Sequence, residues 1–360
     1  MLNVLHLVSG RSFTGPVAAA LADVRSLVAA EHRAWLASRS GTALEAGCTT
    51  QDVPFLGGFR FGKGPARLLN LPRDSKHLRE LCHEHEIDVI HVHRSQEQML
   101  VGWAFGRRSG PSVVRSWHRS PARVSKPLRR HMAAAVKGNT CVAHDHMKAL
   151  AAVGAPCVSY VPPAVDTDRF RPTKKSPGDI PRIGLIGRWK AGEDRGQRAF
   201  LDVLARIQSK ADWRGMLLGR GEGRQELQGR IAEHPRKERV ELLETSDQFA
   251  RQVATLDIGL VFATGSDGTS RPAAELLASG VPVLLADRPG LRELGDDNDG
   301  ARILPATDLD AWARVCEAWL AAPGERHATG SAARRFAEEQ LGLAVRGRTL
   351  AAVYEKICSA

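Results

Sequence analysis

Hydrophobic and polar positions follow two alternating patterns along this chain. Short apolar runs bounded by glycine or polar residues are typical of buried parallel strands. Such runs lie at residues 2–8, 32–38, 50–53, 88–93, 112–118, 183–190, 257–262 and 281–286. Between many of them, apolar residues recur with the spacing of amphipathic helices, as at 17–30, 197–208 and 309–320. This alternation of strand and helix predicts an α/β protein with two doubly wound parallel sheets.

Length and composition predict two domains. A chain of 360 residues is longer than one typical domain. Proline, lysine and serine cluster near 174–181, so the predicted domains are residues 1–163 and 182–343, with a linker at 164–181. Six scattered cysteines without a C-x-x-C pair argue against a zinc site or a disulfide framework. No apolar run reaches the roughly 20 residues of a membrane span and no leader precedes the first strand, so we expect a cytoplasmic protein.

The positive charge is distributed unevenly. The net charge is +11, and residues 1–165 contain 21 Lys and Arg against 11 Asp and Glu, whereas residues 166–360 contain 30 against 29. This asymmetry predicts an anionic partner for the first half, such as a membrane surface, a phosphorylated glycolipid or a nucleic acid. A generally arginine-rich composition is the alternative interpretation.

One segment near the end of the second half has the features of a ligand-binding helix start. Asp267 precedes a small polar turn at 268–270, and Pro272 fits the first turn of a helix that Gly280 ends. The N-terminus of such a helix favours an anion. Glu275, about one turn inside it, can accept hydrogen bonds from two ribose hydroxyls. The segment therefore predicts a sugar-nucleotide site, with Asp267 on the loop that enters the helix.

These residues resemble the signature of the retaining GT-B glycosyltransferases of family 4. That signature is a carboxylate, seven residues, a glutamate, and then a small-residue helix before Gly-x-Pro-Val; Asp267, Glu275 and residues 280–283 match it, with aspartate in place of the usual first glutamate. Residues 161–172 resemble the family's Pro-Asn-Gly-Val-Asp-x-x-x-Phe-x-Pro, although Pro-Ala replaces Asn-Gly. The resemblance implies two Rossmann-like domains facing a cleft, with a C-terminal helix at about 344–360 crossing back to the first.

The resemblance also implies roles at the donor. Glu275 binds the ribose, and Asp267 with the backbone N–H groups after it holds sugar hydroxyls and the diphosphate. Arg188 stabilises the leaving diphosphate with a second cation, for which Arg195 and Lys190 compete; Arg195 is favoured because a helix start fixes its position. The other residues expected to line the donor are Gly15, Gly187, Gly219, Gly221, Leu243, Gly268, Thr269 and Ser270.

Three histidines in the first half carry alternative interpretations. His118 ends its predicted strand, and the resemblance implies that it points at the donor sugar and phosphate; a solvated or core histidine is the alternative. His91 and His93 face the same side of their strand. They are either a metal pair or structural residues at a strand end, and the lack of a third ligand nearby favours the structural role.

Basic residues in the first half predict an acceptor or membrane surface. Residues 54–72 are rich in glycine and proline and predict a loop, in which Phe55, Phe59 and Phe61 are interleaved with cations. This pattern fits contact with an anionic membrane, and equally a loop that packs its own aromatic rings. The residues expected at the acceptor or membrane are Thr14, Arg60, Lys63, Arg67, Arg119 and Arg123.

Together these features imply a retaining glycosyltransferase that moves a sugar from a nucleotide-sugar donor to a glycan or glycolipid acceptor, in cell-envelope polysaccharide or lipopolysaccharide synthesis. No cofactor and no metal are expected, because cations take the place of a metal at the diphosphate. The alternatives are a GT-B sugar-nucleotide epimerase or phosphorylase, and a basic nucleic-acid-binding protein, which would explain the charge but not the diphosphate motif. We expect no nucleic-acid partner, and a cytoplasmic enzyme at the inner face of the membrane.

Overall fold

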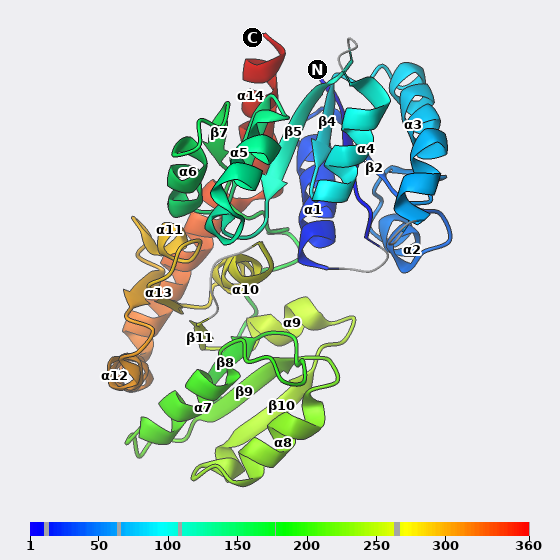
Figure 1. Ribbon diagram of the computed structural model, residues 1–360. Helices are drawn as coiled ribbons and strands as arrows, with labels where there is room; N and C mark the ends of the chain where they lie inside the picture. The colour runs from blue at the N-terminus through cyan, green and yellow to red at the C-terminus, as the bar shows by residue number, and fades with distance from the viewer. Residues whose placement is uncertain (11–13, 63–65, 107–109, 177, 263–266, 360) are drawn as a thin grey trace. The chain divides into compact units, whose positions relative to one another are not determined.

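The protein consists of two compact units, shown in the computed structural model of Figure 1. The structure describes residues 1–10, 14–62, 66–106, 110–176, 178–262 and 267–359. The first unit is built chiefly from Met1–Ala164 and Leu343–Ala360, and the second chiefly from the chain between them. Where the chain enters and leaves the second unit, the N–H of Val165 donates to the carbonyl of Leu341 at 2.9 Å.

A seven-stranded parallel sheet forms the centre of the first unit, in the order β3-β2-β1-β4-β5-β6-β7. The strands are β1 Asn3–Leu7, β2 Arg33–Ala37, β3 Phe55–Leu56, β4 Val89–Val92, β5 Ser112–Trp117, β6 Gly138–Cys141 and β7 Val158–Tyr160. The helices are α1 Gly15–Ala29, α2 Ala43–Thr50, α3 Ala66–Glu84, α4 Ser95–Phe105, α5 Lys126–Ala134, α6 His144–Ala151 and α14 Leu343–Cys358, with a 3₁₀ turn at Pro121–Arg123.

Strand periodicity places two separate cores on the faces of this sheet. Val4 of β1 packs in a core with residues of α1 and α14, whereas Leu5 and Leu7 pack in a second core with residues of α3 and α4. Helix α14 lies along α1 so closely that a Cβ on Gly347 would come 2.0 Å from the carbonyl oxygen of Ser26. Glycine at this position lets the last helix complete the first unit.

Two expectations for the first unit are wrong, and one helix was not predicted. Residues 50–53, predicted as a strand, are the end of α2 and the turn after it, because Leu44 and Cys48 bury a helical face that Thr42 caps. The predicted loop 54–72 contains β3 and the start of α3, which continues through Pro72 at the cost of one backbone hydrogen bond. Helix α4 was not expected; its buried Leu100, Val101 and Ala104 recur at helical spacing.

The second unit has a six-stranded parallel sheet in the order β10-β9-β8-β11-β12-β13. The strands are β8 Arg182–Ile186, β9 Arg214–Gly219, β10 Val240–Glu244, β11 Ile258–Val261, β12 Val283–Ala286 and β13 Ala301–Leu304. The helices are α7 Gln197–Arg206, α8 Arg224–Ala232, α9 Phe249–Ala254, α10 Asp267–Ala278, α11 Arg292–Gly295, α12 Leu309–Ala321 and α13 Pro323–Phe336, with short turns at Lys237–Arg239 and Ala337–Leu341. One continuous hydrophobic core joins this sheet to its helices.

Helix α10 differs from the prediction at its start and agrees at its end. It begins at Asp267, so Pro272 lies inside the helix and Glu275 stands more than two turns from the start. Proline inside a helix removes one hydrogen bond and crowds the carbonyl four residues earlier, so this position is unusual for it. Gly280 ends the helix as predicted, with φ 69°. The Arg334 guanidinium of α13 donates to the carbonyls of Ala278, Phe170 and Thr167 at 2.7–2.9 Å, and so fixes this end of α10.

Candidate functional site

The order of strands in the second sheet reverses between β8 and β11. Doubly wound parallel sheets bind ligands at the carboxyl edge of such a reversal, because the loops there diverge. The loop after β8 leads to α7, and the chain after β11 leads to α10. A Cβ on Gly196, which caps α7 at φ 102°, would come 2.8 Å from the Cβ of Phe262 at the end of β11. The start of α7 and the end of β11 therefore meet at this edge.

Backbone pairing of the loops after β8 and β9 explains the glycines predicted there. The N–H of Gly187 donates to Leu218 at 2.9 Å, that of Trp189 to Arg220 at 3.0 Å, and that of Gly223 to Trp189 at 3.0 Å. A Cβ on Gly219 would come 1.9 Å from the carbonyl oxygen of Gly187. A Cβ on Gly221, at φ 142°, would come 2.0 Å from that of Trp189. These glycines allow two loops to lie backbone to backbone, a role that spacing alone did not indicate.

Gln197 holds both ends of the long loop that follows Arg188. Its buried amide accepts from the Arg195 N–H at 2.6 Å and donates to the Arg188 carbonyl at 3.1 Å. Between these ends, residues 190–193 form a turn in which the N–H of Glu193 donates to the Lys190 carbonyl at 3.1 Å. The backbones of Arg188 and Arg195 are thus tied to the first residue of α7.

The two cations that competed for the diphosphate bind the same carboxylate. The Lys190 ammonium hydrogen-bonds Glu193, and the Arg195 guanidinium lies 3.5 Å from the other oxygen of that group. The hydrogen bond from Lys190 is the main reason that the pKa of Glu193 is lowered, and Arg195 adds to it. Arg188 is exposed. The structure therefore brings Lys190 and Arg195 together around one anionic group instead of separating them.

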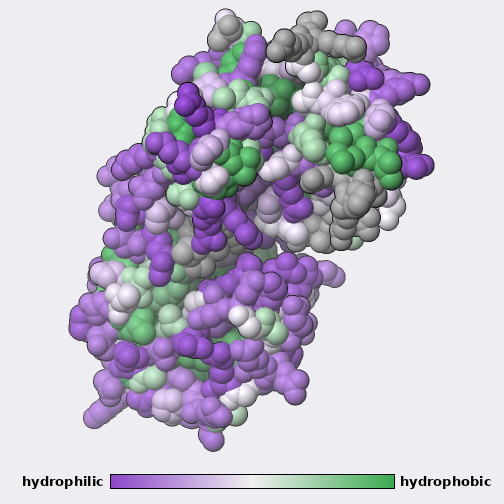
Figure 2. Space-filling view, viewed as in Figure 1, coloured by the Kyte–Doolittle hydropathy of each residue, from purple (hydrophilic) through white to green (hydrophobic). Residues whose placement is uncertain are grey.

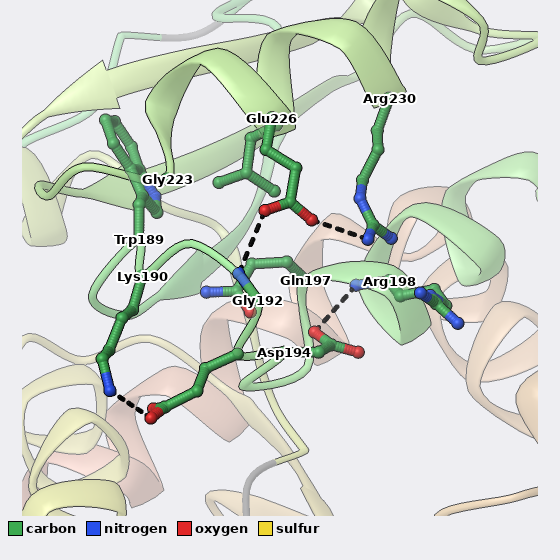
Figure 3. A pocket seen from close by; sticks show the side chains of 11 residues that line it. Trp189, Lys190, Gly192, Asp194, Gln197, Arg198, Gly223, Glu226 and Arg230 are labelled. Atoms are coloured by element: carbon green, nitrogen blue, oxygen red, sulfur yellow. Dashed lines mark hydrogen bonds and ion pairs between the residues drawn. The ribbon is translucent and has the colours of Figure 1, made fainter.

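A pocket of about 260 Å³ lies beside this loop (Figure 3). Asp194 accepts from the N–H groups of Gly196 and Arg198 at 3.0 and 3.2 Å, and so occupies the start of α7. Glu226 of α8 accepts from the Gly192 N–H at 3.2 Å and pairs with Arg230 at 2.9 Å. Carboxylates of the chain itself thus occupy the N–H groups and cations that an anionic ligand would use.

Glu275 lies on α10, at the same unit's reversal point. It is 8% exposed, and the Nε of Arg271, one turn earlier, lies 3.6 Å from its carboxylate. Burial raises the pKa of Glu275, and the charges of Arg271 and Arg169 oppose that rise. The sequence did not indicate Arg169, although it stands inside the stretch 161–172, where its N–H donates to Asp166 at 3.0 Å.

The remaining residues predicted to line the sugar-nucleotide donor lie on α10 and β10. The backbone of Asp267, Gly268 and Thr269 forms the first turn of α10, and their side chains lie outside the described part of the structure. Ser270 is buried in the same helix, and Leu243 is half-buried near the end of β10.

In the first unit the sheet order reverses between β1 and β4, and polar contacts join the segments that follow these strands. The N–H of Ser9 donates to the buried carboxylate of Glu97 at 2.6 Å, and Arg39 donates to the Ser9 carbonyl at 2.7 Å. The Arg94 guanidinium donates to the Thr14 hydroxyl at 2.6 Å. Burial raises the pKa of Glu97, while its hydrogen bonds to Ser9 lower it. Thr14 and Gly15 therefore lie at the start of α1, where hydrogen bonds with neighbouring segments hold the backbone of Ser9 and the Thr14 hydroxyl.

Behind this edge lies a cluster of buried histidines that spans β1, β4 and the end of β5. The Nδ1 of His6 is 3.0 Å from the Nε2 of His93, and the Nδ1 of His93 is 3.0 Å from the Nε2 of His118. His91 instead hydrogen-bonds the Tyr354 hydroxyl at 2.6 Å and the Ser116 hydroxyl at 2.8 Å. Strand alternation did place His91 and His93 on one face, but their partners come from neighbouring strands, the segments after them and helix α14.

His6, Asp23 and His93 form the one group of metal-ligating side chains among the described residues, with ligand atoms within 4.8 Å of one another. Their other contacts argue against an ion there. The two imidazoles are at hydrogen-bonding distance, and Asp23 pairs with the Arg346 guanidinium at 2.6 Å. A fourth ligand, which a structural zinc site requires, is not among them. This cluster fits a hydrogen-bonded network better than a metal centre.

The basic residues predicted to contact an acceptor or a membrane differ in their exposure to solvent. Arg60, Arg119 and Arg123 are exposed, whereas Lys63 and the side chain of Arg67 lie outside the described residues. Phe59 and Phe61 are buried and stacked at 5.3 Å, so this stretch packs its own aromatic rings.

Exposed apolar side chains lie elsewhere: Leu68 and Leu69 of α3 are 62% and 79% exposed, and Trp103 of α4 is 61% exposed. Figure 2 shows hydrophobic surface over these two helices. No helix in the described ranges is long and apolar enough to span a membrane.

Two family models match most of the chain. Residues 18–169 match the model described as Glycosyltransferase Family 4, and residues 180–322 match that described as Glycosyl transferases group 1. The chain is 26% identical, over 325 residues, to the GDP-mannose-dependent alpha-(1-6)-phosphatidylinositol monomannoside mannosyltransferase of Mycolicibacterium smegmatis, covering 82% of this chain and 83% of that protein.

Solved structures with the same fold cover the whole chain. A glycosyltransferase of Rickettsia africae superimposes with a TM-score of 0.80 at 15% identity, over 99% of this chain and 98% of its own. Anabaena HepE in complex with UDP-glucose superimposes with a TM-score of 0.78 at 16% identity, over 100% of both chains. These matches and the two parallel sheets show the GT-B fold.

Proposed function

The chain belongs to the GT-B glycosyltransferases of the family 4, or group 1, type, and we propose that it is a retaining enzyme that moves a sugar from a nucleoside-diphosphate sugar to a lipid-linked glycan of the cell envelope. The observation that carries this proposal is the edge where the second sheet reverses. There Arg188, Lys190 and Arg195 share one loop, and Glu275 stands on the helix that follows the neighbouring strand β11.

In the proposed complex, the cations of the loop bind the diphosphate. Lys190 and Arg195 already bind an anion, the Glu193 carboxylate, so a diphosphate takes the place of Glu193 as their partner. Arginine offers two parallel N–H groups to a phosphate, and the tie between Gln197 and Arg195 fixes the backbone from which this side chain extends. Cations held in place before the reaction stabilise the charge that develops on the leaving group.

The proposed role of Glu275 is to accept the ribose hydroxyls. Its carboxylate is nearly buried, and a charged acceptor forms the stronger hydrogen bonds there. Arg271 and Arg169 favour its ionised form, which the ribose contact requires. His118 of the first unit is proposed to contact the donor sugar and phosphate. In a retaining mechanism of this kind the donor phosphate accepts the acceptor's proton, so no protein base is assigned.

The acceptor is proposed to be a membrane glycolipid. The relative from Mycolicibacterium smegmatis is named for a phosphatidylinositol monomannoside acceptor and a GDP-mannose donor. The excess positive charge in residues 1–165, exposed Arg60 and the exposed leucines of α3 suit an anionic membrane surface. Docking of the first unit at the inner face of the membrane would bring such an acceptor within reach.

The proposal is tested by measuring transfer with the full chain. GDP-mannose and UDP-glucose are each incubated with phosphatidylinositol mannoside in vesicles, and products are identified by mass spectrometry, with the Glu275→Gln variant as control. We expect a glycolipid one hexose heavier with one of the donors, and strongly reduced formation by the variant. An epimerised or hydrolysed donor with no acceptor product would favour the epimerase alternative and contradict the transferase.

A further inference from the structure

Three imidazoles connect the interior of the first unit to His118. His6 of β1, His93 after β4 and His118 after β5 meet end to end, each ring nitrogen of His93 being 3.0 Å from a neighbour. The rings of His93 and His118 stack at 5.1 Å, and those of His6 and His93 lie 5.3 Å apart. In this row of three imidazoles, each contact joins two ring nitrogens, one of which must donate a proton and the other accept it.

Only two proton arrangements are open to this chain. Burial, assisted by Arg346, lowers the pKa of His6 to about 3, and burial lowers the pKa of His93 well below its usual value. Both rings are therefore neutral at physiological pH, and each carries one N–H. Either all the protons point from His6 toward His118, or all point from His118 toward His6.

The inner end of the chain selects between the two arrangements. The Oδ2 of Asp23, on α1, lies 4.0 Å from the Nδ1 of His6 and has no hydrogen-bond partner among the residues that the structure describes. Arg346 of α14 pairs with the other oxygen of Asp23 at 2.6 Å. A carboxylate beside the His6 Nδ1 favours a proton on that nitrogen and opposes a lone pair there. The His6 Nδ1 then donates to His93, and the Nδ1 of His93 donates to His118.

We propose that the row of three imidazoles holds His118 as the tautomer protonated at Nδ1. His118 then gives a hydrogen bond to the nucleotide sugar and does not act as a base. His93 and His6 are its positioning residues. The inference rests on the proposed function, in which His118 contacts the sugar and phosphate. It agrees with a reaction in which the donor phosphate accepts the proton. The hydrogen bond at one imidazole nitrogen decides which nitrogen carries the proton, so His93 sets the chemistry that His118 presents.

The tautomer can be measured without a substrate. In protein with ¹⁵N-labelled histidine, two-bond ¹H–¹⁵N correlations distinguish protonated from unprotonated ring nitrogens, and His118 is assigned by its loss in His118→Asn. We expect a protonated Nδ1 and an unprotonated Nε2 on His118 in the unmodified chain. A protonated Nε2, or a stoichiometric metal bound at His6 and His93, would overturn the proposal without any variant having to fold.

Variants separate positioning from packing. His93→Phe keeps a flat ring in the stack but removes both nitrogens, so we expect His118 to become a mixture of tautomers and kcat to fall about tenfold or more, with a smaller change in KM. His91→Phe is the matched control, since His91 is equally buried on the same face and is bonded to Tyr354 and Ser116 instead. It should leave the His118 tautomer unchanged, and an unchanged tautomer in His93→Phe would contradict the proposal.

The role of His118 as a hydrogen-bond donor is tested by substituting His118 itself. Asparagine places an N–H group near the position of Nδ1 whereas aspartate places an oxygen there, so His118→Asn should retain at least tenfold more transfer activity than His118→Asp. Equal activities would contradict the donor role. If neither variant reduced transfer, the proposal that His118 contacts the substrate would be wrong. The tautomer measurement would still show whether His93 and His6 set the protonated nitrogen of His118.

Discussion

Replacing Glu275 by glutamine should weaken donor binding and stabilise the free protein at the same time. Glutamine keeps the shape of the side chain but removes the charge. A hydrogen bond to a charged group contributes about 1.5–3 kcal/mol. Since about 1.4 kcal/mol corresponds to a tenfold change in affinity, the loss of one such bond predicts about 10-fold to 150-fold weaker binding of the nucleotide.

The expected gain in stability follows from the burial of this carboxylate. A carboxyl group whose pKa is raised by folding binds protons more readily in the folded state, so its contribution to stability is present at low pH and is lost as the pH rises through the raised pKa. At neutral pH the ionised Glu275 therefore costs stability, and the neutral amide removes that cost. Arg271, about half exposed, loses an ion pair of little value.

Both effects are measurable with the full-length protein. Isothermal titration calorimetry with GDP and UDP gives the affinity, and thermal unfolding without ligand gives the stability. Binding to the unmodified chain should weaken as the pH falls through the raised pKa of Glu275, whereas binding to Glu275→Gln should change little over that range. An affinity within twofold of the original, or a lower melting temperature without ligand, would refute the reasoning.

Three further predictions follow from the packing and the charges. Arg195→Ala should lower kcat about 100-fold, as expected for one transition-state donor, and Lys190→Ala tenfold or less; the reverse order in steady-state assays would assign the role to Lys190. Arg334→Ala should destabilise the chain by about 2–4 kcal/mol in urea unfolding because three carbonyls lose a charged donor, while exposed Arg335→Ala should have little effect. Leu68→Asp with Leu69→Asp should reduce co-sedimentation with anionic vesicles but not GDP binding. Val28→Asp, at an exposed apolar site on α1, serves as control, and an equal loss in both would contradict a membrane surface on α3.

The alternation of strands and helices was predictable because buried parallel strands and amphipathic helices leave distinct patterns in the sequence. The fold class and the end of α10 at Gly280 followed from this local information. The start of α10 did not, since proline favours the first turn of a helix, whereas α10 begins at Asp267 and continues through Pro272. The buried stack of Phe59 and Phe61 likewise depended on tertiary packing that the loop's composition does not encode.

The contacts that define the candidate site were less predictable, because they join distant positions. His6 and His93 are 87 residues apart, and His93 and His118 are 25 apart; only the order of β1, β4 and β5 in the sheet brings the three together. The sequence named Arg195 and Lys190 as rivals, but the shared partner Glu193 depends on how the loop folds. Their roles at the donor remain predictions from the family resemblance.

The central claim, a retaining transfer from a nucleotide sugar, is tested most directly by the anomeric configuration of the product. The glycolipid formed from a donor of known α configuration is isolated, and the new linkage is assigned by NMR from the coupling at its anomeric carbon. The α configuration in the product is the predicted result. A β linkage would show that the enzyme inverts the sugar, and would contradict a mechanism in which the donor phosphate takes the proton on the face that the leaving group vacates.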